Sequence, residues 1–203
     1  NFEIIWQTFE DNYAFFDLRE IDWKQVYRDY RPKVSASTSD DSLFAIVSQM
    51  LAPFQDDHIN VIVHGKNQFK ASKPSLFTNE FPTDSLRSAF WKMAETTAPA
   101  NGLGRLKYIG PLYNGKPLFS YSTNEKMGYL RFNRCFVDGN AANVPDAVVA
   151  GKLLDSLFTH FNGLKGLIVD VRDNIGGNDE FAYEIADRFV TRKQVGSYKK
   201  TRK

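Results

Sequence analysis

A glycine pair joins an apolar segment to a predicted helix within Asp-Val-Arg-Asp-Asn-Ile-Gly-Gly-Asn-Asp, residues 170–179. Gly176 and Gly177 lack a Cβ, so their backbone can adopt positive φ angles and a ligand can approach their N–H groups closely. Those groups also lie near a helix N-terminus, whose partial positive charge favours an oxyanion. The chemistry indicated is stabilisation of a negatively charged oxygen. The alternative is a tight strand-to-helix turn that needs glycine for geometry alone.

Polar residues precede the glycine pair. Asp170, Arg172 and Asn174 are predicted to support the loop. Arg172 lies between Asp170 and Asp173, and such charges often pair locally to hold a loop. The charges therefore indicate loop support and do not by themselves indicate a binding site.

No other motif predicts a cofactor or a metal site. His58, His64 and His160 and their neighbouring carboxylates lack a metal-ligand spacing such as His-x-x-x-His. Gly102-Leu103-Gly104 lacks the Lys-Ser/Thr of a phosphate loop. Cys135 is the only cysteine, so no internal disulfide can form, and a buried or half-buried thiol is its default interpretation.

The elements that must position these residues begin with three helices. Large apolar residues at three- and four-residue spacing predict helices over residues 2–13, 23–30 and 40–51. Asp22 is the expected N-cap of the second helix, and Ser-Asp-Asp (39–41) starts the third. These helices are expected to form a small bundle with an aromatic core. Alternating apolar residues from 59 to 63 then predict a strand with one buried face.

The rest of the chain mixes strand and helix patterns. The expected elements are a helix over residues 85–94, strands over 116–121 and 127–132, and helices over 145–161 and 181–190. The apolar run over 167–171 predicts a strand buried on both faces of a parallel or mixed sheet. Asp179 is expected to cap the last helix.

The fold class predicted is α/β, in three parts. Residues 1–57 form the N-terminal helical domain, residues 58–125 a linker or strand region without a clear PDZ domain, and residues 126–203 the first part of an α/β core. Between residues 65 and 115 the pattern is less regular than elsewhere. The α/β core is expected to be incomplete at residue 203.

The composition excludes several classes of protein. Among 203 residues, 42% are hydrophobic and 25% charged, as in an ordinary globular protein. The formal net charge of +2, from 26 basic and 24 acidic residues, argues against a dedicated nucleic-acid binder. The basic residues after position 191 are expected to be a solvated tail. No apolar run reaches about 18 residues, so no membrane span is predicted.

Motifs at both ends of the chain together resemble the C-terminal-processing, or tail-specific, serine peptidase family. Gly-Tyr-Leu-Arg-Phe (128–132), a long helix and Gly-Leu-Ile-Val-Asp-Val-Arg-Asp-Asn-Ile-Gly-Gly (166–177) are similar to the family's Gly-Tyr-Ile-Arg-Ile, helix and Ile-Ile-Asp-Leu-Arg-x-Asn-x-Gly-Gly. Tyr-Ala-Phe-Phe (13–16), Ile-Asp-Trp (21–23) and Asp-Asp-His (56–58) resemble its helical domain. The resemblance implies a small helical bundle followed by an incomplete ClpP/crotonase-like core. It also implies an oxyanion hole that uses a backbone N–H of the glycine pair.

The sequence departs from the family pattern in two places. Residues 65–125 lack the Gly-Leu-Gly-type carboxylate loop of the PDZ domain found in many members, which implies a PDZ-less branch related to tricorn-like enzymes and retinoid-binding repeats. Ser197 lies too close to the glycine loop and lacks the family's Ser-Ala-x-Glu setting. No nucleophile is therefore assigned, and the chain is expected to end before the catalytic serine.

The resemblance implies that His58 is the general base of the tricorn-like branch. A histidine suits proton transfer because its reference pKa lies near neutrality. The alternative is a histidine held by Asp56 or Asp57 through hydrogen bonds at a junction between domains. The sequence leaves both interpretations open.

The leading hypothesis is that the parent protein hydrolyses peptide bonds of protein or peptide substrates. This chain would supply the helical cap and the oxyanion loop, and the fragment alone is expected to be inactive. The alternatives are a non-catalytic module that binds a peptide or small apolar ligand on the same scaffold, and nucleic-acid binding through the basic tail. The resemblance implies export to a periplasm or cell surface. No cofactor, metal or nucleic-acid partner is expected, and the oligomeric state is not predicted.

Overall fold

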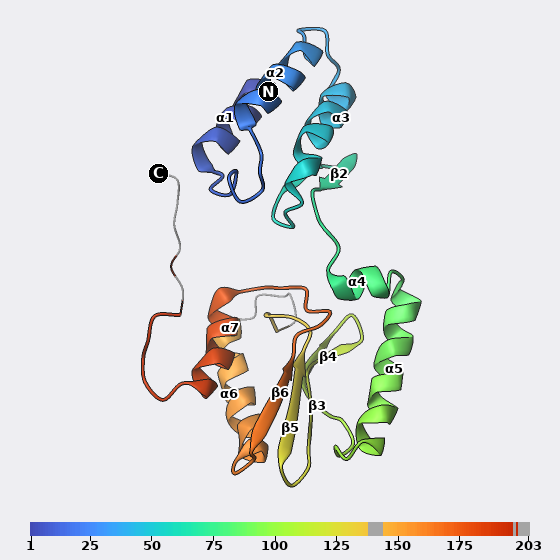
Figure 1. The fold of residues 1–203 in the computed structure, drawn as a ribbon, viewed down its shortest axis with the longest axis vertical. Helices are drawn as coiled ribbons and strands as arrows, with labels where there is room; N and C mark the ends of the chain where they lie inside the picture. Colours follow the sequence, from blue (N-terminus) through green and yellow to red (C-terminus); the bar gives the residue numbers. More distant parts are fainter. Residues whose placement is uncertain (138–143, 197, 199–203) are drawn as a thin grey trace. The chain divides into compact units, whose positions relative to one another are not determined.

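The computed structural model describes residues 1–137, 144–196 and 198, and it confirms the α/β class (Figure 1). The chain divides into two compact units. We call Asn1–Pro74 the helical unit and Ser75–Gln194 the sheet unit. Each unit has its own hydrophobic core.

Three helices form most of the helical unit, as the apolar spacing predicts. They are α1 (Phe2–Asn12), α2 (Trp23–Tyr30) and α3 (Asp40–Leu51), and 3-10 turns η1 (Arg31–Lys33) and η2 (Ala52–Phe54) follow the last two. The predicted Asp22 cap forms, and Ser39, at the predicted start of the third helix, is an N-cap as well. Asp22 accepts a hydrogen bond from Gln25 N at 2.8 Å, and Ser39 accepts one from Ser42 N at 3.2 Å. These side chains satisfy amides that a first helical turn leaves without partners.

Aromatic rings fill the core of the helical unit. Trp23 and Phe54 are 3% and 0% exposed, and their rings meet edge to face at 5.4 Å between centroids. Trp6 and Trp23 stack with centroids 6.1 Å apart. Each indole N–H donates to the other residue's carbonyl oxygen, at 3.2 and 3.1 Å. This reciprocal pair ties α1 to the start of α2.

An antiparallel hairpin follows the three helices. Its strands are β1 (Asn60–Val63) and β2 (Asn67–Lys70). Ile59, just before β1, is buried in the helical core, whereas Val63 at the far end of the strand is exposed. The strand predicted from the alternation of apolar residues is therefore present, with its buried end nearest the helices.

A four-stranded mixed sheet forms the centre of the sheet unit. Its strands lie side by side in the order β3 (Lys107–Tyr113), β4 (Lys116–Thr123), β5 (Met127–Phe132) and β6 (Gly166–Asp170). The first three are antiparallel, whereas β6 runs parallel to β5. A parallel pair needs a crossover connection. That connection contains α6 (Asp146–Phe158) and the 3-10 turn η3 (Thr159–Phe161).

Helices lie on both sides of the sheet (Figure 1). On one side are α6 and α7 (Asp179–Ala186), the latter followed by η4 (Asp187–Phe189). Leu130 of β5, Leu154 of α6 and Phe181 of α7 are each 0% exposed and belong to one core cluster. This core fixes the position of the helix that begins just after the glycine pair.

The other side of the sheet contacts α5 (Asp84–Ala100), which follows the short α4 (Leu76–Glu80). The guanidinium of Arg131 on β5 lies 3.2 Å from the ring centroid of Trp91. Tyr108 of β3 donates its O–H to Glu95 at 2.8 Å. Burial and the nearby Glu95 carboxylate raise the pKa of Tyr108 to about 12. These polar contacts, together with the cation–π stack, attach α5 to the sheet.

Two expectations about the last third of the chain are wrong. The strand over residues 167–171 is not buried on both faces, since Ile168 is 48% and Val171 53% exposed. In the described chain β6 is the last strand of the order, so only β5 pairs with it. The cap of the last helix is Asn178 and not Asp179, because the Asn178 side chain accepts from Glu180 N at 3.0 Å.

No helix within the described ranges has both the length and the apolar content needed to cross a membrane.

Candidate active site

The loop after β6 is clamped to the chain segment that follows β5. Cys135 N donates to Gly176 O at 2.7 Å, and Asn178 N donates to Cys135 O at 2.8 Å. These two bonds make a parallel bridge between Cys135 and Gly177. The loop thereby resumes the β5–β6 pairing beyond the end of β6, and the backbone of the glycine pair is held at a defined place.

Both glycines adopt backbone conformations that favour glycine. Gly176 has a φ of +82°, but a Cβ there would meet nothing within 4 Å. Gly177 has a φ of +143°, and a Cβ there would lie 2.4 Å from the carbonyl oxygen and 2.5 Å from the carbonyl carbon of Cys135. Such an approach is forbidden by van der Waals repulsion. The close contact between the loop and Cys135 therefore depends on the missing side chain of Gly177.

The two glycine amides have different environments. Gly176 N donates to Asn174 Oδ1 at 2.7 Å, so this N–H is satisfied within the loop. In the bridge, the residues on either side of Gly177 bond to Cys135, so the N–H of Gly177 itself points away from Cys135. It has no hydrogen-bond acceptor in the part of the chain that the structure describes. Gly177 is exposed and directly precedes Asn178, the N-cap of α7, so it lies near a helix N-terminus as the sequence indicated.

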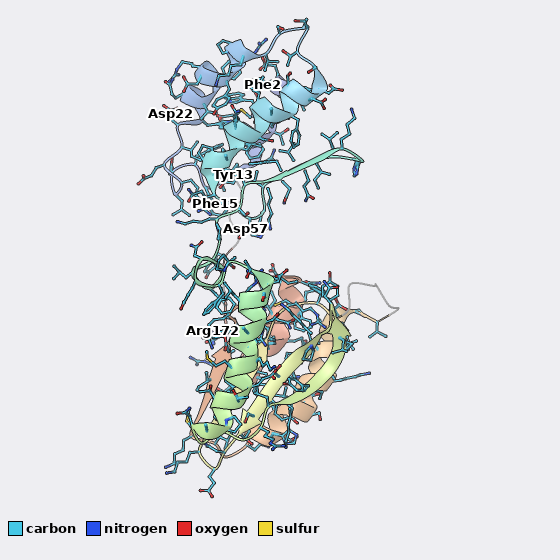
Figure 2. All side chains as sticks on the ribbon, turned by 90° about the vertical axis from the view of Figure 1, so that its right-hand side faces the viewer. Phe2, Tyr13, Phe15, Asp22, Asp57 and Arg172 are labelled. Atoms are coloured by element: carbon cyan, nitrogen blue, oxygen red, sulfur yellow. The ribbon has the colours of Figure 1, made fainter. Side chains whose placement is uncertain are left out.

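Asp170 and Arg172 form an ion pair where β6 ends; Arg172 is labelled in Figure 2. Arg172 donates from Nε to Asp170 Oδ1 at 3.0 Å and from Nη2 to Oδ2 at 2.7 Å, and its backbone N–H donates to Oδ1 at 3.0 Å. Tyr129 O–H also donates to Oδ2, at 2.8 Å. Burial alone would raise the pKa of Asp170, but these bonds outweigh it and lower that pKa. The carboxylate stays ionised and fixes the first residues of the loop.

Asn174 holds the turn with both polar atoms of its side-chain amide. Its Oδ1 accepts from Gly176, and its Nδ2 donates to Phe132 O at 3.2 Å. The neighbouring Asp173 has a φ of +61°, and its carboxylate accepts from Lys116 Nζ at 3.1 Å. All three residues predicted to support the loop thus contact its backbone or the strand beside it, and Asp173 pairs with β4 and not with Arg172.

Arg134 also supports the loop and was missed by the sequence reasoning. Its side chain is 0% exposed and donates to Val137 O at 2.7 Å and to Pro111 O at 2.9 Å. It thereby braces the segment next to the loop, in which Asn133 O accepts from Ile175 N at 2.9 Å. A charged residue placed soon after a buried strand is the one sequence signal that could have drawn attention to it.

His58 lies in the helical unit, against a buried carboxylate. Asp56 is 7% exposed, accepts from the backbone N–H of His58 at 3.0 Å and lies 3.2 Å from its Nδ1. Tyr13 O–H donates to the other carboxylate oxygen at 2.9 Å. Burial alone would raise the pKa of Asp56, but the hydrogen bonds from His58 and Tyr13 lower it. Asp56 is therefore ionised and acts as an acceptor for both residues.

This arrangement fixes the tautomer of His58. An ionised carboxylate only accepts hydrogen bonds, so Nδ1 of a neutral His58 carries the proton and Nε2 has a free lone pair. The His58 side chain is 98% exposed, so Nε2 is accessible. The sequence left Asp56 and Asp57 as alternative partners; Asp57 lies instead 3.9 Å from Lys70 Nζ. Asp56 is the residue that orients His58.

The remaining candidate residues do not gather into a site. His64 is exposed in the turn between β1 and β2, and His160 is exposed and stacks on Tyr121 at 5.1 Å. Burial raises the pKa of the Cys135 thiol. Among residues 1–137, 144–196 and 198, no three His, Cys, Asp or Glu side chains converge as metal ligands would. Ser197 and the basic residues Lys199, Lys200, Arg202 and Lys203 lie outside the described residues.

Two family models match separate parts of the chain. Residues 1–52 match the Tricorn protease C1 domain, and residues 126–203 match peptidase family S41. The first match covers the three helices of the helical unit, and the second begins one residue before β5 and includes the glycine loop. No curated protein matches the chain.

One similar solved structure is a crystal structure from Parabacteroides merdae ATCC 43184, described as a "putative peptidase". It shares 29% sequence identity with this chain, with a TM-score of 0.63, over 94% of this chain and 52% of that chain. The chain thus spans about half the length of that protein. Residues 126–203 are thus similar to peptidase family S41, residues 1–52 to the Tricorn protease C1 domain, and the chain as a whole to a solved peptidase-like structure.

Proposed function

We propose that the chain supplies the oxyanion loop and the general base of a serine-type peptidase that hydrolyses peptide bonds of proteins or peptides. The observation that carries the proposal is the N–H of Gly177, which points away from the Cys135 clamp and has no acceptor among the described residues. The match to peptidase family S41 supports the reaction class.

The Gly177 N–H would stabilise the negative charge that forms on the peptide carbonyl oxygen when a nucleophile attacks it. The backbone bonds of Cys135 hold this donor in place before the reaction, so no reorganisation is needed as the charge develops. A preorganised donor of this kind typically contributes about 3 kcal/mol, or a factor of about 10²–10³ in rate. Gly176 has a different role, because its N–H shapes the loop through Asn174.

His58 would accept the proton of the serine through Nε2. Asp56 binds the other ring nitrogen of His58, and Tyr13 donates a hydrogen bond to Asp56. His58 would thus be the base that activates the nucleophile, and Asp56 the group that orients the base. The exposure of the ring supports this role, because a reacting group can reach Nε2. No serine of this chain is assigned as the nucleophile.

Fluorophosphonate labelling of the full-length gene product tests the proposal. The probe should label one serine, and His58→Ala should slow this labelling by about 10² or more, because the base that activates the serine is lost. His64→Ala is the matched control: His64 is also exposed and close in sequence, but it has no carboxylate partner in the described chain. Absence of labelling, or equal slowing by both substitutions, would refute the proposal.

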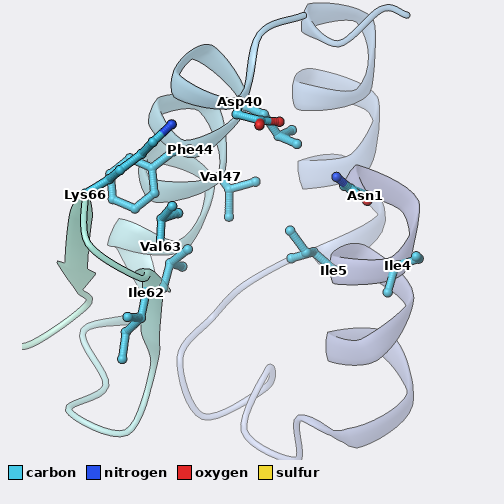
Figure 3. Close-up of a pocket in the computed structure, with 11 residues that line it drawn as sticks. Asn1, Ile4, Ile5, Asp40, Phe44, Val47, Ile62, Val63 and Lys66 are labelled. Carbon is cyan, nitrogen blue, oxygen red and sulfur yellow. The ribbon is translucent and has the colours of Figure 1, made fainter.

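A second candidate function is a non-catalytic module that holds a peptide or small apolar ligand. An apolar groove of about 380 Å³ in the helical unit favours it, formed by α1, α3 and the β1 hairpin (Figure 3). Ile5, Val47 and Ile62 are among its lining residues, with Asp40 and Lys66 as its charged members. A pure binder of this kind would resist the fluorophosphonate, so the same experiment separates the two functions.

A further inference from the structure

A second groove of the helical unit lies beside His58. It has a volume of about 470 Å³, within the range of about 300–1,000 Å³ typical of ligand pockets. Phe9, Tyr13 and Phe15 contribute aromatic rings to its lining, Ile59 contributes an aliphatic side chain, and His58 itself borders it. The proton transfer proposed above needs His58 but does not need this apolar surface.

The aromatic lining is held in a fixed arrangement. The Tyr13 ring meets Phe16 at 5.1 Å and Phe54 at 5.0 Å, both edge to face, while its O–H is fixed by Asp56. Phe15 contacts Tyr13 at 5.8 Å and yet remains 51% exposed. Figure 2 shows both rings at the same end of the helical unit as Asp57. About half of the Phe15 surface is therefore available to a ligand without rearrangement of the core.

The groove offers no free ionised side chain to a charged occupant, as far as the described residues show. Among the described residues no lysine or arginine lines it, and the carboxylate of Asp56 is buried and already accepts from Tyr13 and His58. A charged group placed there would lose water without gaining an ion-pair partner. The groove chemistry therefore favours an uncharged apolar occupant.

Two carboxamides in the lining could bind a peptide backbone. Asn12 and Asn60 donate from Nδ2 to Thr8 O at 2.8 Å and to His58 O at 3.4 Å. Their Oδ1 atoms have no donor within the described residues, so each could accept a peptide N–H. The groove thus combines apolar walls for a side chain with acceptors for the main chain that carries it.

We propose that this groove binds an aromatic or large aliphatic side chain of the peptide substrate, next to the bond on which His58 acts. The assignment of the occupant as a substrate rests on the proposed function, because it takes His58 as the base. The preference of the groove for an apolar side chain rests on its own lining.

Amide NMR titration of the 203-residue chain tests this preference directly. The probes are the N-acetyl, N-methylamide derivatives of phenylalanine, lysine and glutamate, which differ in the side chain alone. The phenylalanine probe should shift the backbone amides of residues 12–15 and 58–60 and bind about tenfold or more tightly than either charged probe. Equal binding of the three probes, or shifts confined to other residues, would overturn the proposal.

A matched pair of variants gives a second measurement. Phe15→Ser removes a ring that is half exposed and should abolish the preference for the phenylalanine probe. Leu18→Ser removes a side chain that is 73% exposed and lies outside the groove, so it should leave the preference intact. A Phe15→Ser protein that is folded, as judged by its amide spectrum, and keeps the preference would contradict the proposal.

Selective binding of the phenylalanine probe can be measured independently of catalysis. His58→Ala keeps the aromatic and aliphatic walls, so it should retain selective binding of the phenylalanine probe while slowing fluorophosphonate labelling of the full-length gene product. Loss of labelling with retained binding supports both proposals. Selective binding without any labelling leaves the groove assignment standing as an apolar side-chain site and refutes the peptidase proposal. Labelling without selective binding refutes the groove alone.

Discussion

Replacing Gly177 with alanine should damage the protein far more than replacing Gly176, although both glycines have positive φ angles. At Gly177 the new Cβ would lie 2.4 Å from the carbonyl oxygen of Cys135, which is backbone and cannot rotate away. At Gly176 the Cβ would enter open space. The pair is a matched test, since the substitution is the same and the positions are adjacent.

The expected magnitudes follow from these contacts. Gly176→Ala incurs the cost of an alanine in the left-handed region, about 1–2 kcal/mol, partly offset by the lower entropy of the unfolded chain. Gly177→Ala adds a clash that only separation of the loop from Cys135 can relieve. That separation breaks the bonds to Gly176 O and from Asn178 N, each worth about 0.5–1.5 kcal/mol. The free energy of unfolding should therefore fall by about 3 kcal/mol or more for Gly177→Ala.

Urea unfolding of both variants, with native-state hydrogen exchange of the Cys135 and Asn178 amides, measures this difference. Exchange of these two amides should accelerate strongly in Gly177→Ala and only slightly in Gly176→Ala. In the full-length gene product, Gly177→Ala should also slow fluorophosphonate labelling. If the two alanine variants unfold at the same urea concentration with unchanged exchange at Cys135 and Asn178, the clamp does not hold the loop as described.

Three further predictions concern stability. Arg134→Met should lower the free energy of unfolding by about 3 kcal/mol or more, because several buried carbonyl groups lose their donor; a urea midpoint close to the parent's would contradict this. The pKa of Asp170 is lower in the folded protein than its ordinary value of about 3.9, so ionisation of this carboxyl stabilises the fold. This stabilisation is fully present above the ordinary pKa and is lost as pH falls through the lower pKa of the folded state. The stability difference between the parent and Asp170→Asn should therefore narrow in urea titrations below about pH 4, and a constant difference would refute the linkage. Asn178→Ala should cost about 1 kcal/mol and speed exchange of the Glu180 amide, whereas the other helices should exchange as before.

The helices of the helical unit were predictable because their signals are local. Asp22 forms the N-cap that the sequence indicated, and Ser39 caps the helix that residues 39–41 were expected to start. The apolar spacing between these starts and the following prolines sets the lengths of α2 and α3. The core of aromatic rings follows from the same spacing. Local signals of this kind do not depend on which other segments lie nearby.

The sheet unit was less predictable, since its strands depend on distant neighbours. β3 was missed because Gly110 and Pro111 interrupt it. The structure accommodates them with a register shift between Ile109 and Leu112, and a Cβ on Gly110 would come within 2.9 Å of Leu118. The expected helix over residues 85–94 is longer, because α5 continues through Pro99 into its last turn. The apolar composition of β6 suggested burial, but composition does not reveal which neighbours a strand has.

The candidate site likewise combines features that could be predicted from the sequence with features that could not. The glycine pair and its polar supports could be found from their order along the chain. The difference between the two glycines could not, because it depends on Cys135, a residue about 40 positions earlier that meets Gly177 only in the folded chain. The choice of Asp56 over Asp57 likewise depends on Tyr13, which approaches from the loop after α1.

The three tryptophans give each unit its own optical reporter. Trp6 and Trp23 are stacked inside the helical unit, whereas Trp91 lies under the guanidinium of Arg131 in the sheet unit. A Trp91→Phe protein would emit from the helical unit alone, and a protein with phenylalanine at both other positions would emit from the sheet unit alone. Tryptophan emission can therefore show whether heat or urea melts the two units together or one after the other.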